Sequence, residues 1–182
     1  MTGTLYGVGL GPGDPELITR KAARLLQTCP VIAYPQLAGA ASFARAIAAD
    51  LLPAGRQEIV MDVPMTIDRA PAQAAYDRGA VAFAEALEAG LDVAARCEGD
   101  PFFYGSFMYL YARLSDRFPV EVVPGGTSLT ACAGQAARPL VARNDVMTIL
   151  PGPLDDDALL EHLRKAETLA IMKVGRHLPR LR

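Results

Sequence analysis

Three short glycine-rich segments carry the residues best suited to hold a small molecule. They read Gly-Leu-Gly-Pro-Gly-Asp-Pro over residues 9–15, Cys-Glu-Gly-Asp-Pro-Phe-Phe-Tyr-Gly over 97–105, and Pro-Gly-Gly-Thr-Ser over 124–128. Glycine allows a ligand to approach bare backbone, and the neighbouring aromatic rings can form the apolar wall of a pocket. The three segments therefore indicate a binding site made of loops.

The first segment does not fit the two common nucleotide-binding loops. The dinucleotide pattern G-x-G-x-x-G/A requires glycine or alanine where this chain has Pro12, counted from Gly7, or Asp14, counted from Gly9. A Walker loop ends in Lys-Ser/Thr, which is absent here, and an aspartate at a helix start repels phosphate. Spacing alone favours a strand-to-helix turn, so we do not expect phosphate binding.

Each of the other two segments also has a simpler interpretation. Asp100 can bond to its own backbone in a Gly-Asp-Pro turn, with the aromatic rings in the core. Thr127 or Ser128 can cap the helix that follows. The coincidence of three such loops on the same edge of one sheet favours a ligand site, because open α/β sheets bind ligands at the carboxyl ends of their strands.

Composition excludes several other functions. The two histidines, His162 and His177, lie outside every glycine segment, so neither a hydrolytic base nor a metal cluster is expected. The widely spaced Cys29, Cys97 and Cys132 suit a reducing compartment. A net charge of −2 disfavours nucleic acid. With no signal peptide and no apolar run of about 18 residues, we expect a cytoplasmic protein that does not enter membranes.

The elements that must position these loops alternate along the chain. Apolar runs predict strands over residues 4–8, 31–34, 57–63, 92–97, 120–123, 146–150 and 169–173. Helical spacing predicts helices over residues 15–29, 42–52, 73–89, 107–114, 128–135 and 158–165, the first of them capped by Asp14. This alternation predicts an α/β fold, with a mostly parallel sheet and flanking helices. We expect an N-terminal domain over residues 1–143 and the start of a second α/β domain over 144–182.

Taken together, the three segments resemble those of the tetrapyrrole (corrin/porphyrin) methyltransferases, in order along essentially the whole chain. The resemblance implies two α/β domains with S-adenosylmethionine, the methyl donor, in the cleft between them, and it implies no metal bound by the protein. It also implies a homodimer and a tetrapyrrole substrate. Family members continue beyond the position of Arg182, so an incomplete second domain is expected, and a non-catalytic tetrapyrrole-binding fragment is the alternative of a different class.

Within the family, the chain looks most like the branch that methylates precorrin-2 at C-20 to give precorrin-3A in cobalamin biosynthesis. The stretches that carry this likeness are residues 5–19, 31–36, 63–68, 97–110 and 171–176. In the uroporphyrinogen-methylating relatives an aspartate follows the tyrosine of the second strand, whereas this chain has Pro35 there. The alternatives are cobalt-loaded precorrin-2 and, within the same fold, uroporphyrinogen III, ribosomal RNA or diphthine.

The likeness also implies site residues, although it identifies no catalytic one. The positions that match the donor site are Pro12, Gly99, Asp100, Phe103, Thr127, Ser128 and Met172. The positions expected to contact the tetrapyrrole are Gly11, Gly13, Asp14, Tyr34, Met65, Thr66, Arg69 and Tyr104. Because the substrate is a polycarboxylate, Arg69, Arg96 and Arg143 are candidate carboxylate partners; for each, the alternative is an ordinary solvated surface arginine.

Overall fold

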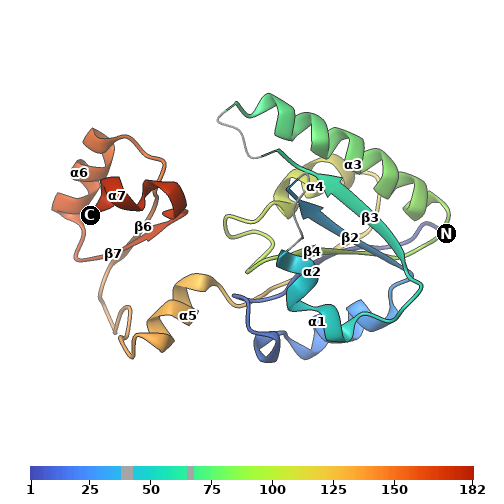
Figure 1. Ribbon diagram of the computed structural model, residues 1–182, viewed down its shortest axis with the longest axis horizontal. Coiled ribbons are helices and arrows are strands. Elements are labelled where there is room, and N and C mark those ends of the chain that lie inside the picture. The colour runs from blue at the N-terminus through green and yellow to red at the C-terminus, as the bar shows by residue number, and fades with distance from the viewer. Residues whose placement is uncertain (38–42, 65–67) are drawn as a thin grey trace. The chain divides into compact units, whose positions relative to one another are not determined.

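The computed structural model describes residues 1–37, 43–64 and 68–182, which form two compact units, Met1–Thr127 and Ser128–Arg182 (Figure 1). This division falls earlier in the chain than the boundary expected between residues 143 and 144, since residues 128–143 group with the second unit. The domain limits given from the sequence remain a prediction.

A five-stranded parallel sheet forms the centre of the first unit. Its strands are β1 (Leu5–Gly9), β2 (Val31–Gln36), β3 (Gln57–Asp62), β4 (Val93–Cys97) and β5 (Val120–Val123), in the spatial order β3-β2-β4-β1-β5. The central strand β4 is buried along its whole length. It reads as a short, mainly apolar run because helices cover both faces of the sheet. The predicted mostly parallel α/β fold is confirmed.

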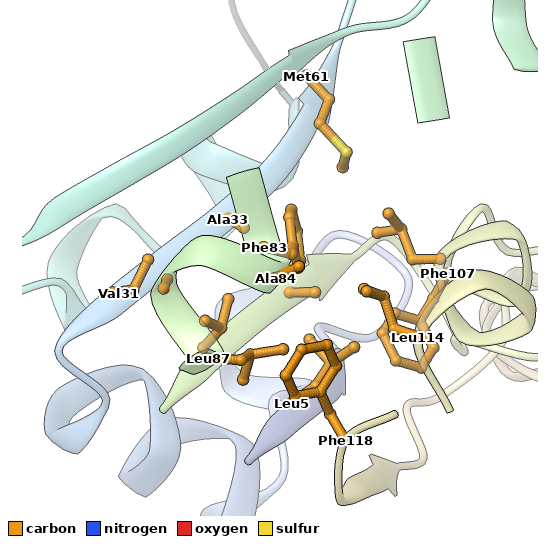
Figure 2. Close-up of a cluster of buried hydrophobic side chains, with 14 of the residues drawn as sticks. Leu5, Val31, Ala33, Met61, Phe83, Ala84, Leu87, Phe107, Leu114 and Phe118 are labelled. Carbon is orange, nitrogen blue, oxygen red and sulfur yellow. The ribbon is translucent and has the colours of Figure 1, made fainter. Parts of the chain in front are cut away.

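Helices lie on both faces of this sheet (Figure 1). α1 (Arg20–Thr28) and α2 (Phe43–Ile47) pack on one face, whereas α3 (Ala70–Glu88) and α4 (Phe107–Leu114) pack on the other. Figure 2 shows the core under α3 and α4, where Phe83 and Leu87 meet Leu5, Phe107 and Leu114. No helix in the described ranges combines the length and the apolar character that crossing a membrane requires.

The first predicted helix is wrong as a single element. Asp14 caps a short 3-10 turn, η1 (Pro15–Leu17), by accepting a hydrogen bond from the Glu16 N–H. The chain is then extended at Ile18, and Thr19 accepts from the Ala22 N–H to start α1. The break follows from two side-chain caps in close succession, each of which satisfies N–H groups that a continuous helix would bond internally.

Two other predicted helices also differ from the structure at their limits. The helix expected over residues 42–52 divides into α2 and the 3-10 turn η2 (Ala49–Leu51). The helix expected from Gln73 begins earlier, at Ala70, because the Asp68 carboxylate accepts from the Ala70 N–H and a proline follows in the first turn.

The second unit consists of α5 (Ser128–Gln135), β6 (Met147–Pro151), α6 (Asp156–Lys165), β7 (Thr168–Met172), the 3-10 turn η3 (Gly175–His177) and α7 (Leu178–Leu181). Strands β6 and β7 pair in parallel, joined by α6. Asp155 caps α6 by accepting from the Ala158 N–H. The sequence did not predict η3 and α7. Arg180 ties α7 to the loop after β6 by donating to the Leu154 carbonyl oxygen and pairing with Asp156.

Candidate functional site

The three glycine-rich loops follow three neighbouring strands of one sheet. β1 lies between β4 and β5, so the loops after β4, β1 and β5 stand side by side at the carboxyl edge. The expectation that they share an edge is confirmed. The helix after β1 packs on one face of the sheet and the helix after β4 on the other. Open α/β sheets bind their ligands at such a reversal of direction.

The loops after β1 and β4 are joined backbone to backbone. The Gly99 N–H donates to the Gly11 carbonyl oxygen at 2.8 Å, and the Gly11 N–H donates to the Gly99 oxygen at 3.2 Å. Both residues have a left-handed backbone, with φ of +78° at Gly11 and +66° at Gly99. This conformation costs a residue with a side chain about 1–2 kcal/mol, which explains glycine at both positions.

The loop after β5 packs against the other two so closely that a side chain has no room. A Cβ at Gly125 would lie 2.1 Å from the Gly99 oxygen, and a Cβ at Gly9 would lie 2.5 Å from the Gly125 nitrogen. These glycines therefore allow the loops to approach one another. The sequence interpretation, in which glycine admits a ligand to bare backbone, did not foresee this second role.

The Asp100 carboxylate holds the second loop in shape. Its Oδ1 accepts hydrogen bonds from the Phe102 and Phe103 N–H groups at 2.9 and 3.1 Å, as the turn interpretation predicted. Its Oδ2 accepts from the Gly125 N–H at 3.1 Å, which links this loop to the one after β5. Asp100 is thus already engaged within the protein, and its part in donor binding remains a prediction.

The aromatic residues of the second loop divide between surface and interior. Phe102 is 47% exposed and meets the edge of the Tyr111 ring, with ring centres 5.1 Å apart. Phe103 and Tyr104 are half-buried and meet edge to face at 5.2 Å. Tyr104 has a positive φ of 54°, a strained conformation for a tyrosine, of the kind that gathers at ligand sites. The rings form part of the edge rather than of the core.

The other residues predicted from the sequence lie in different parts of the chain. Of the donor positions, Pro12 and Thr127 belong to the loops at this edge, whereas Ser128 opens α5 and Met172 ends β7 in the second unit. Of the substrate positions, Gly13 and Asp14 belong to the loop after β1 and Arg69 is exposed beside the start of α3. Met65 and Thr66 lie outside the described residues.

A cluster of polar side chains lies on the α1 and α2 face of the sheet, near the ends of β2 and β4; its Tyr34 and Arg96 are buried, whereas its Glu58 and Arg45 are exposed. It consists of Arg45, Glu58, Tyr34 and Arg96, here called the Arg96 cluster. The guanidinium carbon of Arg96 is 4.4 Å from the centre of the Tyr34 ring. The Tyr34 hydroxyl donates to Glu58 Oε2 at 2.6 Å, and Glu58 pairs with Arg45 of α2 at 3.6 Å.

The surroundings of this cluster shift the pKa of three of its members. Burial lowers the pKa of Arg96 to about 10, although the nearby Glu58 carboxylate acts in the opposite direction. Burial and the hydrogen bond to Glu58 raise the pKa of Tyr34. That same hydrogen bond lowers the pKa of Glu58. At neutral pH Arg96 is therefore ionised, Glu58 is a carboxylate and Tyr34 is a neutral phenol.

The structure corrects one interpretation of the arginines. Arg96 is completely buried, so it is not an ordinary surface arginine, whereas Arg143 is exposed. Sequence reasoning missed Glu58 and Arg45, because single charged residues in a strand and in a helix resemble solvated ones. Within the described ranges, no group of three His, Cys, Asp or Glu side chains gathers to hold a metal. His162 is exposed on α6.

A sequence model of the family described as Tetrapyrrole (Corrin/Porphyrin) Methylases matches residues 4–182. The chain belongs to this family. The resemblance drawn from the three loops is thereby confirmed, and the tetrapyrrole methylase fold accounts for the parallel sheet and its flanking helices.

Relatives within the tetrapyrrole methylases match nearly the whole chain. It is 43% identical over 188 residues to the precorrin-2 C(20)-methyltransferase of Sinorhizobium sp, covering 99% of this chain and 77% of that protein. The cobalt-precorrin-2 C(20)-methyltransferase of Salmonella typhimurium is 30% identical, with 96% and 74% covered. The crystal structure of uroporphyrin-III C-methyl transferase from Thermus thermophilus, complexed with S-adenyl homocysteine, is 30% identical with a TM-score of 0.68, covering 96% of this chain and 72% of that one.

Proposed function

We propose that this chain is an S-adenosylmethionine-dependent methyltransferase that methylates C-20 of precorrin-2, giving precorrin-3A in cobalamin biosynthesis. The observation that carries the proposal is the likeness to the Sinorhizobium precorrin-2 C(20)-methyltransferase along 99% of this chain. The three loops that meet at the β4–β1–β5 edge support it, because they supply a ligand edge at the reversal point of the sheet.

Methyl transfer demands positioning more than acid–base chemistry. S-adenosylmethionine, when bound, supplies a methyl group already activated by its sulfonium centre. The protein must hold the meso carbon, that methyl group and the leaving sulfur in line, and such alignment alone lowers a barrier substantially. The absence of a histidine from the glycine-rich loops is therefore compatible with the reaction. The residue that takes the proton from the meso carbon is left unassigned.

The carboxyl edge fits a donor that is bound largely through backbone groups. Gly126 is exposed, and of the residues that the structure describes a Cβ there would meet Pro12 alone, at an ordinary 3.5 Å. Loop packing thus leaves this position open, in contrast to Gly125. We assign the donor to Pro12, Gly99, Asp100, Phe103 and Thr127 of the first unit, with Ser128 and Met172 of the second. The donor product bound in the Thermus relative supports the donor class.

The tetrapyrrole is assigned to the loop after β1 and to the end of β2. Gly13 supports this, because among the described residues only the Phe43 side chain lies near the space that a Cβ at Gly13 would fill. The proposed contacts are Gly11, Gly13, Asp14, Tyr34, Met65, Thr66, Arg69 and Tyr104. A cobalt-loaded precorrin-2 is the second candidate substrate, which the Salmonella relative favours.

Assembly and location belong to the same proposal. We place the protein in the cytoplasm as a homodimer that binds neither nucleic acid nor membranes and holds no metal of its own. The free thiols of Cys29 and Cys97, both buried, suit a reducing compartment. The exposed rings of Phe102 and Tyr111 offer an apolar surface for a second copy.

The first experiment is a calorimetric titration of the 182-residue chain with S-adenosylhomocysteine. It is followed by methyl-transfer assays with precorrin-2, cobalt-precorrin-2 and uroporphyrinogen III, with the methylated carbon located by NMR. Saturable donor binding and methylation at C-20 support the proposal. A folded chain that binds tetrapyrrole without any affinity for S-adenosylhomocysteine would instead be a non-catalytic binding module.

A further inference from the structure

Arg96 is the one buried charged residue among those described, and its hydrogen-bonding groups have no partner. The residue is 0% exposed, in the middle of the sheet. None of Nε, Nη1 and Nη2 finds a hydrogen-bond acceptor among the described residues. Buried polar groups in folded proteins are almost always paired, so an exception of this size calls for a specific explanation.

The charge on Arg96 is not removed by its surroundings. Its pKa, lowered by burial to about 10, still leaves the guanidinium protonated at neutral pH. The Tyr34 ring compensates in part through a cation–π contact. The carboxylate of Glu58 is already bonded to the Tyr34 hydroxyl and paired with Arg45. The folded chain therefore holds a buried cation whose N–H groups could all bind an acceptor.

The Arg96 guanidinium belongs to a residue near the carboxyl end of β4, close to the edge of the sheet where the three loops meet. Arg96 pairs in register with Val8 of β1 and immediately precedes Cys97, where β4 ends and the second glycine loop begins. Tyr34 is near the end of β2, on the other side of β4. Arg45 of the short helix α2 joins the same cluster through Glu58.

We propose that the Arg96 guanidinium binds a peripheral carboxylate of the tetrapyrrole, a role that deepens and rests on the function proposed above. A guanidinium matches a carboxylate with two parallel hydrogen bonds, which no neighbour among the described residues now provides. Because Arg96 is covered, the proposal includes an outward shift of α2 that admits the carboxylate. Until then the guanidinium stays against the Tyr34 ring, which Glu58 fixes through the Tyr34 hydroxyl.

The test compares three variants in the binding of uroporphyrin III, a stable tetrapyrrole polycarboxylate, followed by absorbance. Arg96→Met removes the charge with little change in volume, and Arg96→Lys keeps the charge but loses the paired hydrogen bonds. Arg117→Met is the matched control, since Arg117 is exposed and pairs with Glu88 at the surface. Calorimetry with S-adenosylhomocysteine and thermal unfolding are measured on each variant.

Arg96→Met loses the buried guanidinium that would pair with a tetrapyrrole carboxylate, so this variant should bind uroporphyrin III about 30-fold or more weakly than the wild type. Arg96→Lys should lie between this variant and the wild type, and Arg117→Met should match the wild type. Affinity for S-adenosylhomocysteine should be unchanged in all three. The wild type should also prefer uroporphyrin III to coproporphyrin III, which has fewer carboxylates, and Arg96→Met should lose part of that preference.

Equal uroporphyrin III affinity in Arg96→Met and the wild type would overturn the proposal and leave Arg96 a structural residue. A wild type that does not bind uroporphyrin III would overturn it as well. If Arg96→Met does not fold, unchanged affinity in Arg96→Lys overturns the proposal and weakened affinity supports it. A wild type that binds uroporphyrin III through Arg96 but shows neither donor binding nor methyl transfer would refute the proposed function while leaving the carboxylate site intact.

Discussion

The Oδ2 atom of Asp100 accepts a hydrogen bond from the backbone N–H of Gly125, with 3.1 Å between the two atoms. This contact joins the loops after β4 and β5, whose strands lie on opposite sides of β1. The loop after β1 is joined to the loop after β4 by the paired backbones of Gly11 and Gly99. The candidate donor edge is therefore a single hydrogen-bonded structure before any ligand binds.

Replacement of Asp100 should cost both stability and donor affinity. Asp100→Ala leaves the N–H groups of Phe102, Phe103 and Gly125 without their carboxylate acceptor. We expect a loss of about 1–3 kcal/mol in the free energy of unfolding, measured by urea denaturation, together with weaker S-adenosylhomocysteine binding in calorimetry. Asp100→Asn keeps one oxygen acceptor and should lose less. Asp116 is exposed, so Asp116→Ala is the control. A similar loss of stability and of donor affinity in that variant would show that Asp100 has no special role.

Adjacent glycines of the third loop should respond differently to alanine. A Cβ at Gly125 would lie 2.1 Å from the backbone oxygen of Gly99, so Gly125→Ala must push the loops apart. We expect about 1–3 kcal/mol of destabilisation by urea denaturation. The new Cβ in Gly126→Ala lies at an ordinary 3.5 Å from Pro12, so this variant should have a stability within about 0.5 kcal/mol of the wild type.

The Gly126→Ala variant also tests the donor assignment. If the exposed backbone at Gly126 faces the donor, its S-adenosylhomocysteine affinity should fall although its stability does not. Unchanged donor affinity in this variant would contradict the placement of the donor beside Gly126. Equal stability of the two alanine variants would contradict the packing argument instead.

The sequence predicted the strands and the glycine loops because both are local signals. Alternation and turn residues identified β4, α4, β5 and α5 at nearly their observed limits. The spatial order β3-β2-β4-β1-β5 did not follow, since it depends on contacts between residues far apart in the chain. The packing of Gly125 on Gly99 was hidden for the same reason: glycine looks alike in sequence whether it admits a ligand or a neighbouring loop.

Arg96 shows most clearly which features cannot be predicted from the sequence alone. It was selected as an arginine near a strand end, but nothing in the run Val-Ala-Ala-Arg-Cys distinguishes a buried guanidinium from a solvated one. Its burial depends on β2, β1 and α2, which come from other parts of the sequence. The contact of Arg96 with the Tyr34 ring and the hydrogen bond from Tyr34 to Glu58 were likewise not predictable from the sequence, because they join residues that are far apart in the chain.

Alkaline pH should destabilise the protein through its buried thiols. Burial raises the pKa of Cys97 from 9.0 to about 12, so this thiol ionises in the unfolded chain at a lower pH than in the folded one. The folded state then binds more protons between those values, and stability falls as pH rises from about 9 to about 12, by about 1.4 kcal/mol per pH unit from this group.

Urea denaturation at a series of pH values separates Cys97 from the other thiols. Cys97→Ala should show a shallower decline of stability above pH 9 than the wild type, even though the small cavity lowers its stability at every pH. Cys132 is exposed, so Cys132→Ala should keep the wild-type slope. A slope unaltered by Cys97→Ala would show that the thiol does not stay protonated in the folded chain.

Tyr34 should stabilise the fold through two separable contacts. Tyr34→Phe keeps a ring beside the Arg96 guanidinium but removes the hydroxyl that donates to Glu58. We expect it to lose about 0.5–1.5 kcal/mol in the free energy of unfolding, measured by urea denaturation. Tyr34→Leu also removes the ring and should lose about 2 kcal/mol more, because a desolvated cation–π contact is the main compensation that the described residues offer the buried charge.

Tyr34→Leu combined with Arg96→Met should recover part of that additional loss, since no buried cation remains to be compensated. If Tyr34→Phe and Tyr34→Leu are equally stable, or if the double variant recovers nothing, the ring does not compensate Arg96, and the hydroxyl bond to Glu58 alone accounts for the contribution of Tyr34.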